Sequence, residues 1–242
     1  VCNMVSCPDG KIRALSNEMI FKDQKYLTAI YHAEMAYSLA RNGFAIEPKG
    51  KGLYEIGGID QKVIDQFSKR SGQINSAVQN LRGKYPRACE AELRRMAALE
   101  TRSAKDKNIT PNQLNKAWSR QIKNDLKMSK DEIIKDLEAA CDRYQSQEAG
   151  QIPTALEFVT AAVRDLGQKE GAFRDKAVLS HSMSLSLGHY HPVDISQAFN
   201  KACEEGIIQQ IGQKIFKNGL SEKIYSTPGM VKTVKETFHS PD

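Results

Sequence analysis

The chain has 242 residues, of which 40% are hydrophobic and 26% are charged, and its formal net charge is +6. This composition is typical of a globular protein with one large domain or two small ones. No run approaches the roughly eighteen apolar residues of a membrane-spanning helix, and the start of the chain lacks the pattern of a secretion signal. These observations exclude a membrane-spanning helix, and we expect a cytoplasmic protein without a membrane partner.

A β-hairpin is predicted at the start of the chain. Residues 1–5 and 11–15 have the pattern of two short strands. Between them, Cys7-Pro8-Asp9-Gly10 has the proline and the glycine that are typical of a turn. Residues 21–25 are polar and basic, and we interpret them as a connection to the first long helix.

Residues 29–58 carry the clearest pattern in the chain. Apolar side chains recur there at three- and four-residue spacing, which predicts an amphipathic helix that turns this face inward. The residues of this face are Ile30, Tyr31, Met35, Leu39 and Ala40. Asn42-Gly43 would end the helix, because glycine accepts the left-handed conformation of a C-cap. Alternation with period two over residues 44–47 and 53–56 then predicts two strands, with a turn at residues 48–52.

The middle of the chain has helical patterns. Asp60 is the predicted N-cap of a helix that continues to Leu81, and a second helix is expected at residues 88–99. Thr110-Pro111-Asn112-Gln113 combines a capping box with a proline at the first helical position, which predicts a helix over residues 111–125. We expect Trp118 to anchor its core. A second capping box at residues 129–132 predicts a further helix through Arg143.

Positive charge is concentrated in this middle part. Residues 69–130 contain 15 Lys/Arg and 5 Asp/Glu, a balance of +10. Residues 1–145 as a whole hold 25 basic and 18 acidic side chains, whereas residues 146–242 hold 10 and 11. Such concentration is typical of a protein with a polyanionic partner. The alternative is a lysine-rich helical surface that faces solvent.

A domain boundary is predicted at residues 146–151, a short polar segment with a glycine at which the charge balance changes. Three helices are expected beyond it, at residues 153–166, 174–187 and 194–205, followed by two short strands around a polar segment. Three helices and a terminal hairpin are the pattern of a winged-helix module. Its third helix has more acidic than basic residues, which favours a structural or protein-contact role over phosphate binding.

A complete active site is not indicated. The five cysteines are scattered without the paired spacing of a zinc site, and the phosphate-loop, GxSxG and HExxH motifs are missing. His189-Tyr190-His191 could bind a metal only on a strand, and here it precedes a proline at a turn between helices.

A tyrosyl nucleophile is conceivable at Tyr26, Tyr31 or Tyr37, but packing explains these tyrosines better, with Tyr31 in the core and the other two at its edge. Tyr26 and His32 could also stack on unpaired bases.

A family resemblance extends over most of the chain. The stretches that carry it are Asn3-Met4, Asp9-Gly10-Lys11-Ile12-Arg13-Ala14-Leu15-Ser16, Tyr31-His32-Ala33-Glu34, Asn42-Gly43-Phe44, Tyr54-Glu55-Ile56-Gly57-Gly58-Ile59, Phe67-Ser68-Lys69-Arg70-Ser71 and Thr101-Arg102-Ser103-Ala104-Lys105. In order and spacing they resemble the later part of the relaxase domain in MobF-type (TrwC/TraI-like) conjugative relaxases. Ile224-Tyr225-Ser226-Thr227-Pro228-Gly229-Met230 resembles the segment that opens the helicase region of this family.

The resemblance implies a protein of plasmid transfer. Family members nick one DNA strand at the transfer origin, with an N-terminal tyrosine as nucleophile and a histidine triad that holds a divalent metal. In the family these residues precede the stretch matched by residues 1–4, and the helicase motifs would follow Asp242. We therefore expect a fragment of a longer protein, with no catalytic residue, no metal ligand and no cofactor of its own.

The resemblance also implies a surface that holds single-stranded DNA. In the family, the hairpin, the loop and the start of the next helix line the strand cleft, and a basic helical extension wraps the bound strand. The matching positions are Lys11, Arg13, Lys22, Lys25, His32, Lys69, Arg70, Arg102 and Lys105. An arginine can occupy the place of His32 in relatives, so a neutral imidazole there would weaken the phosphate contact. For each cation, the alternative is an ordinary solvated side chain.

Together these observations predict an α+β protein. Residues 1–145 would be a partial antiparallel-sheet relaxase domain with a basic helical extension, and residues 146–242 a mostly helical, winged-helix-like module. The predicted function is binding of single-stranded DNA at a transfer origin without turnover, and further partners would be type IV secretion or relaxosome proteins.

Two other hypotheses stay open. The chain could be a non-catalytic protein-interaction or structural module whose basic helices only keep it in solution. Salt distinguishes this from DNA binding, because phosphate binding weakens steeply between about 50 and 200 mM salt. The same gene could also supply the missing N-terminal part, which would make the parent protein an enzyme.

Overall fold

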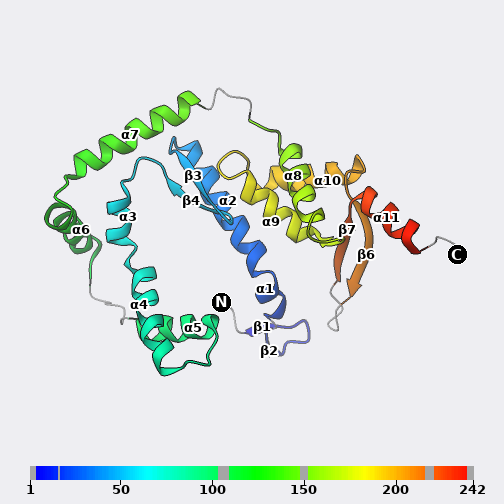
Figure 1. Ribbon diagram of the computed structural model, residues 1–242, viewed down its shortest axis with the longest axis horizontal. Coiled ribbons are helices and arrows are strands. Elements are labelled where there is room, and N and C mark those ends of the chain that lie inside the picture. The colour runs from blue at the N-terminus through cyan, green and yellow to red at the C-terminus, as the bar shows by residue number, and fades with distance from the viewer. Residues whose placement is uncertain (1–3, 16, 103–108, 148–151, 216–220, 239–242) are drawn as a thin grey trace. The chain divides into compact units, whose positions relative to one another are not determined.

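The computed structural model describes residues 4–15, 17–102, 109–147, 152–215 and 221–238 (Figure 1). Helices dominate, and small antiparallel sheets accompany them, so the predicted α+β class is confirmed. Contacts divide the chain into two compact units: the first unit comprises residues 1–57 and 143–242, and the second unit comprises residues 58–142. Among the described helices, none is long and apolar enough to cross a membrane.

The first unit begins with the predicted hairpin. β1 (Met4–Ser6) pairs antiparallel with β2 (Ile12–Ala14), and Met4 lies opposite Ala14. Gly10 in the turn has a φ of +73°, a left-handed conformation that glycine adopts without strain. The two strands are therefore joined by the turn that the sequence predicts.

Two helices, α1 (Glu18–Lys22) and α2 (Gln24–Arg41), follow the hairpin. Residues 21–25, which we interpret as a polar, basic connection to the first long helix, are helical except for Asp23, which separates α1 from α2. The Asp23 carboxylate lies 2.5 Å from the Lys176 ammonium, and both side chains are largely buried. This ion pair holds the start of α2 against α9 (Asp175–Leu185).

The buried face of α2 differs from the predicted one. Tyr31 and Met35 are 61% and 40% exposed, whereas Ala33 and Ala36 are buried. The other members of the predicted face, Ile30, Leu39 and Ala40, are partly buried against the core as expected. Small side chains allow the backbones of α2 and α9 to approach each other closely, and a tyrosine at the contact would hold them apart. Figure 1 shows the two helices side by side.

β3 (Ile46–Gly50) and β4 (Leu53–Ile56) form the predicted ribbon. β3 begins later than expected and extends through Gly50, so the turn shortens to Lys51-Gly52. Positive φ angles at Gly50, Lys51 and Gly52, of 81°, 54° and 74°, let the chain reverse within this short turn. The predicted turn at residues 48–52 is therefore too long.

The C-terminal part of the first unit contains the three predicted helices and the predicted hairpin. The helices are α8 (Ala155–Gly167), α9 and α10 (Pro192–Glu204), and the strands are β6 (Gln209–Ile215) and β7 (Ser221–Ser226). β5 (Phe173–Arg174), which we did not predict, pairs with β7, so the strand order is β5-β7-β6. α11 (Pro228–Phe238) follows. The winged-helix assignment stays a prediction.

One hydrophobic core joins the two sequence segments of the first unit. Ala33, Ala36 and Ile46 belong to the same buried cluster as Val159 and Ile195. The compact units therefore do not coincide with the expected segments 1–145 and 146–242. The expected boundary followed local composition, whereas the core depends on apolar contacts between residues far apart in sequence. Whether the two segments act as separate domains stays a prediction.

The described residues of the second unit form five helices or parts of helices. They are α3 (Gln61–Phe67), α4 (Lys69–Lys84), α5 (Glu90–Glu100), α6 (Pro111–Asp125) and the start of α7 (Lys130–Gln147). The continuous helix expected from Asp60 to Leu81 is wrong, because Ser68 interrupts it with a φ of −97° and a ψ of 38°. The bounds of α6 and the capping box of Thr110 and Gln113 are confirmed.

The described part of the second unit contains a small hydrophobic cluster. Val78 and Leu81 of α4 meet Leu93 and Ala97 of α5 there. Trp118 is 43% exposed, and α6 has no fully buried residue in the described structure. The expectation that Trp118 anchors a core is therefore wrong. The spacing of the apolar residues correctly predicts the helix, but it does not show whether Trp118 is buried.

Candidate nucleic-acid interface

Two of the predicted DNA-binding residues lie in or beside the hairpin of the first unit. Lys11 is exposed at the end of the turn, and Arg13 is on β2. The Arg13 guanidinium donates to both carboxylate oxygens of Asp9, at 2.9 and 2.5 Å. It thereby lowers the pKa of the Asp9 carboxyl. A phosphate that binds Arg13 must therefore compete with a carboxylate, whereas Lys11 has no ion pair among the described residues.

Lys22 and Lys25 lie at the junction of α1 and α2. Lys22 is in the last turn of α1 and Lys25 is in the first turn of α2, and both are exposed. Only Asp23 and Gln24 separate them along the chain. The Asp23 carboxylate between them forms an ion pair with Lys176.

His32 lies among aromatic rings in the first unit. Its side chain is half-buried, and its ring contacts Tyr31 and Tyr54 edge-on, with centroids 5.5 and 6.2 Å apart. Burial raises the pKa of the Tyr54 hydroxyl. The two tyrosine rings hold the His32 imidazole in position, and part of the side chain remains exposed to solvent.

Tyr31 is a candidate that the sequence pattern concealed. Tyr31 is 61% exposed, and it lies six residues after Lys25 on α2. An exposed aromatic face can stack on unpaired bases. Tyr26, which we considered for stacking, is instead half-buried, and burial raises the pKa of its hydroxyl. The helical spacing of Tyr31 pointed to the core, so only the structure reveals its exposure.

The remaining predicted residues belong to the second unit. Lys69 is exposed at the start of α4, and Arg102 is exposed just after α5. The Arg70 guanidinium reaches the end of α5, where it donates to the Thr101 carbonyl at 2.7 Å and to the Ala98 carbonyl at 2.5 Å. Lys105 lies outside the described residues.

Arg70 therefore has a structural function in addition to any contact with DNA. It also donates to the Thr101 hydroxyl at 2.8 Å. The carbonyls at the C-terminus of a helix lack intrahelical partners, and a cation there also favours the helix dipole. Arg70 thus fastens the end of α5 to the start of α4.

The histidine pair considered as a metal site has other partners. The His191 Nδ1 accepts a hydrogen bond from the Val193 amide at 3.2 Å, and its Nε2 lies 2.7 Å from the Glu34 carboxylate. His189 stacks on Phe158, with ring centroids 6.3 Å apart. His191 is thus the N-cap of α10. In the part of the chain that the structure describes, no group of three or more His, Cys, Asp or Glu side chains could hold a metal ion.

An α+β fold with exposed cations on its helices is typical of proteins that bind polyanions. The sequence matches the family model of the TrwC relaxase over residues 1–124, more than half of its length. The chain therefore belongs to the TrwC relaxase family, and the resemblance to conjugative relaxases is confirmed.

Two solved structures are similar to the chain. A conjugative relaxase TrwC in complex with mutant OriT DNA is 33% identical, and the similarity covers 50% of this chain and 42% of that one, with a TM-score of 0.41. A metal-free conjugative relaxase TrwC in complex with OriT DNA is 32% identical, with coverages of 52% and 43% and a TM-score of 0.42. The chain spans less than half the length of these relaxases. No curated protein matches the sequence.

Proposed function

We propose that the chain is a DNA-holding part of a conjugative relaxase, which binds single-stranded DNA at a transfer origin and cuts no strand of its own. The family match over residues 1–124 carries this proposal, because it contains all nine positions predicted to bind DNA. The description of the similar relaxases as complexes with OriT DNA supports the same partner here.

The described side chains suggest how a strand would be held. Lysines such as Lys11 and Lys25 would contact phosphates, which positions a strand without reading its sequence. Tyr31 and the edge of His32 would stack on bases. Strand cleavage needs a nucleophile and a Lewis acid, and in this proposal other residues of the relaxase supply the tyrosine and the histidines that hold the divalent metal. In this proposal the protein acts in the cytoplasm.

Fluorescence anisotropy of a labelled oligo(dT) of about 25 nucleotides, titrated with the full chain, tests the binding. We expect micromolar affinity near 50 mM salt and a loss of about tenfold or more near 200 mM, because each phosphate contact releases counterions. A complete lack of binding at low salt would contradict the proposal and favour the protein-interaction hypothesis. Nicking of a supercoiled plasmid by the chain with Mg²⁺ would contradict the absence of cleavage.

A further inference from the structure

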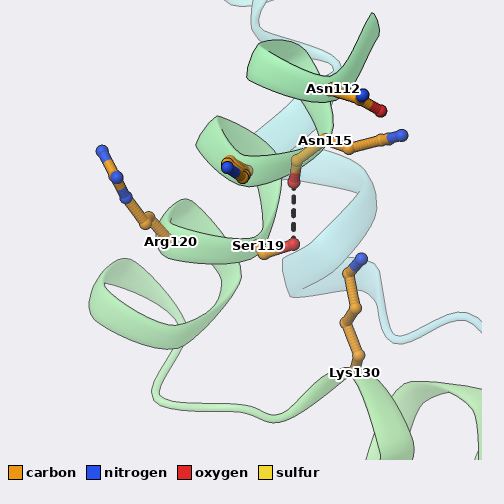
Figure 2. Close-up of a pocket in the computed structure, with 6 residues that line it drawn as sticks. Asn112, Asn115, Ser119, Arg120 and Lys130 are labelled. Atoms are coloured by element: carbon orange, nitrogen blue, oxygen red, sulfur yellow. Dashed lines mark hydrogen bonds between the residues drawn. The ribbon is translucent and has the colours of Figure 1, made fainter.

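We infer that a groove between α6 and the start of α7 binds the phosphate backbone of a single DNA strand. The inference rests on the proposed function, and it adds a subsite that the nine predicted positions do not include. The groove has a volume of about 500 Å³ and is open to solvent (Figure 2). The residues that line it are Asn112, Asn115, Lys116, Ser119, Arg120 and Lys130.

The charge of this groove favours an anion. Three of the six lining residues are cations, and none is acidic. Lys116 and Arg120 are one turn apart on α6, so they lie on the same side of the helix. Within the described residues, the ion pairs of this unit join Arg82 and Arg94 to Glu90 and leave the cations of the groove without a carboxylate.

The arrangement of the cations suits an extended strand better than a compact ion. Figure 2 shows the Lys130 side chain extending from α7 toward Ser119, whereas the Arg120 side chain extends away from Lys130. The Ser119 hydroxyl donates to the Asn115 carbonyl at 2.7 Å. The exposed amide groups of Asn112 and Asn115 remain as neutral donors along the same surface.

The lining also indicates which part of a nucleotide the groove binds. It contains no aromatic or aliphatic residue, so bases would find no surface on which to stack. Lysine, arginine, amide and hydroxyl groups are the usual partners of phosphate oxygens. The nearby Glu132 carboxylate accepts from the Ser129 amide at 2.7 Å and is held in the capping box of α7. The groove is therefore expected to bind a strand without sequence preference.

A matched pair of triple variants tests the groove. The groove variant combines Lys116→Ala, Arg120→Ala and Lys130→Ala, and the control combines Lys62→Ala, Lys84→Ala and Lys135→Ala. Both sets are exposed, lie in the same unit and lose the same charge. Alanine is compatible with helices, and circular dichroism verifies that both variants fold.

We expect the groove variant to bind the oligo(dT) roughly tenfold or more weakly near 50 mM salt, from about two- to fivefold for each cation. The slope of log K against log salt should become shallower by up to about 2, since each lost phosphate contact on a single strand removes about 0.7. The control should lose about twofold or less. Equal losses in both variants would overturn the inference.

Lysine footprinting of the unmodified chain provides a test that needs no variant. Acetylation followed by mass spectrometry should show Lys116 and Lys130 protected by the oligo(dT), while Lys62, Lys84 and Lys135 react as before. Binding with Lys116 and Lys130 fully reactive would overturn the groove alone. No binding by the unmodified chain would overturn the proposed function and the groove with it.

Discussion

The two units of the chain are stabilised in different ways. In the first unit, α2, β3, α8, α9, α10 and β7 contribute to one core, in which Val159, Ile195 and Ile208 have almost no exposed surface. In the second unit, the small core of α4 and α5 is accompanied by α6, which has no fully buried residue in the described structure. The first unit depends on contacts between distant residues, and the second depends more on local helix signals.

This difference coincides with the distribution of charge. The residues that carry the concentrated positive charge, 69–130, lie within the second unit. A ligand that binds only the folded state stabilises that state by mass action. We therefore expect a bound strand to stabilise the second unit more than the first.

Ile195→Ala should have the largest effect on the first unit. The side chain is fully buried, so the cavity should lower the free energy of unfolding by about 2–5 kcal/mol. Hydrogen exchange should show faster opening of α8, α9 and α10. The chain has one tryptophan, Trp118, which reports on the second unit, and its urea transition should not move. A parallel shift of the Trp118 signal would show that the two units unfold together.

Leu93→Ala should destabilise the second unit by about 2–3 kcal/mol. Leu93 is 2% exposed in a core with few other buried side chains, so little remains to fill the cavity. Hydrogen exchange should accelerate in α4 and α5 and stay unchanged in α9 and α10. Leu99→Ala is the matched control, because Leu99 is 69% exposed and its loss should cost less than about 0.5 kcal/mol.

Alanine variants of Arg70 and Arg102 should distinguish a structural role from a contact with DNA. Arg70→Ala removes the hydrogen bonds to Thr101 and Ala98, and should lower the stability of the α4–α5 pair by about 1 kcal/mol. Arg102 is exposed, so Arg102→Ala should leave the melting temperature unchanged and weaken oligo(dT) binding. A stable Arg70→Ala protein with normal exchange in α5 would refute the supporting role.

The smallest effect concerns the capping boxes that both units use. Hydrogen bonds from Thr154 lower the pKa of the Glu157 carboxyl, and those from Ser129 do the same for Glu132. Their stabilising contribution is therefore complete above the unfolded pKa and is lost as the pH falls through the lowered folded pKa. Glu157→Gln should make α8 less sensitive to acid. Circular dichroism during acid titration, compared with Glu138→Gln on exposed α7 surface, measures this difference.

Local structure could be predicted from the sequence where its causes are local. The bounds of α6 follow from Thr110, Pro111 and Gln113, which act within one turn. The buried face of α2 could not be predicted in the same way, because its partner α9 lies far along the chain. Only that partner decides that Ala33 is buried and Tyr31 exposed.

The candidate interface was also predictable in part: its positions could be predicted, but its contacts could not. The positions of its residues come from the family resemblance, and the structure describes eight of the nine predicted positions. Their contacts could not be predicted. The Arg70 side chain reaches carbonyls about thirty residues later in the sequence, at Ala98 and Thr101. The groove of α6 needs a lysine from the next helix, so spacing within one helix does not reveal it.

The interrupted sequence of the first unit has a consequence for synthesis on the ribosome. Residues 58–142 are translated between the two segments that share its core. At roughly 5–20 residues per second, α2 would wait on the order of ten seconds for α8, α9 and α10 to emerge. The second unit, whose core joins neighbouring helices, can fold during this interval. The nascent chain would therefore complete its smaller unit first and its larger core last, with the alanine face of α2 accessible to chaperones in between.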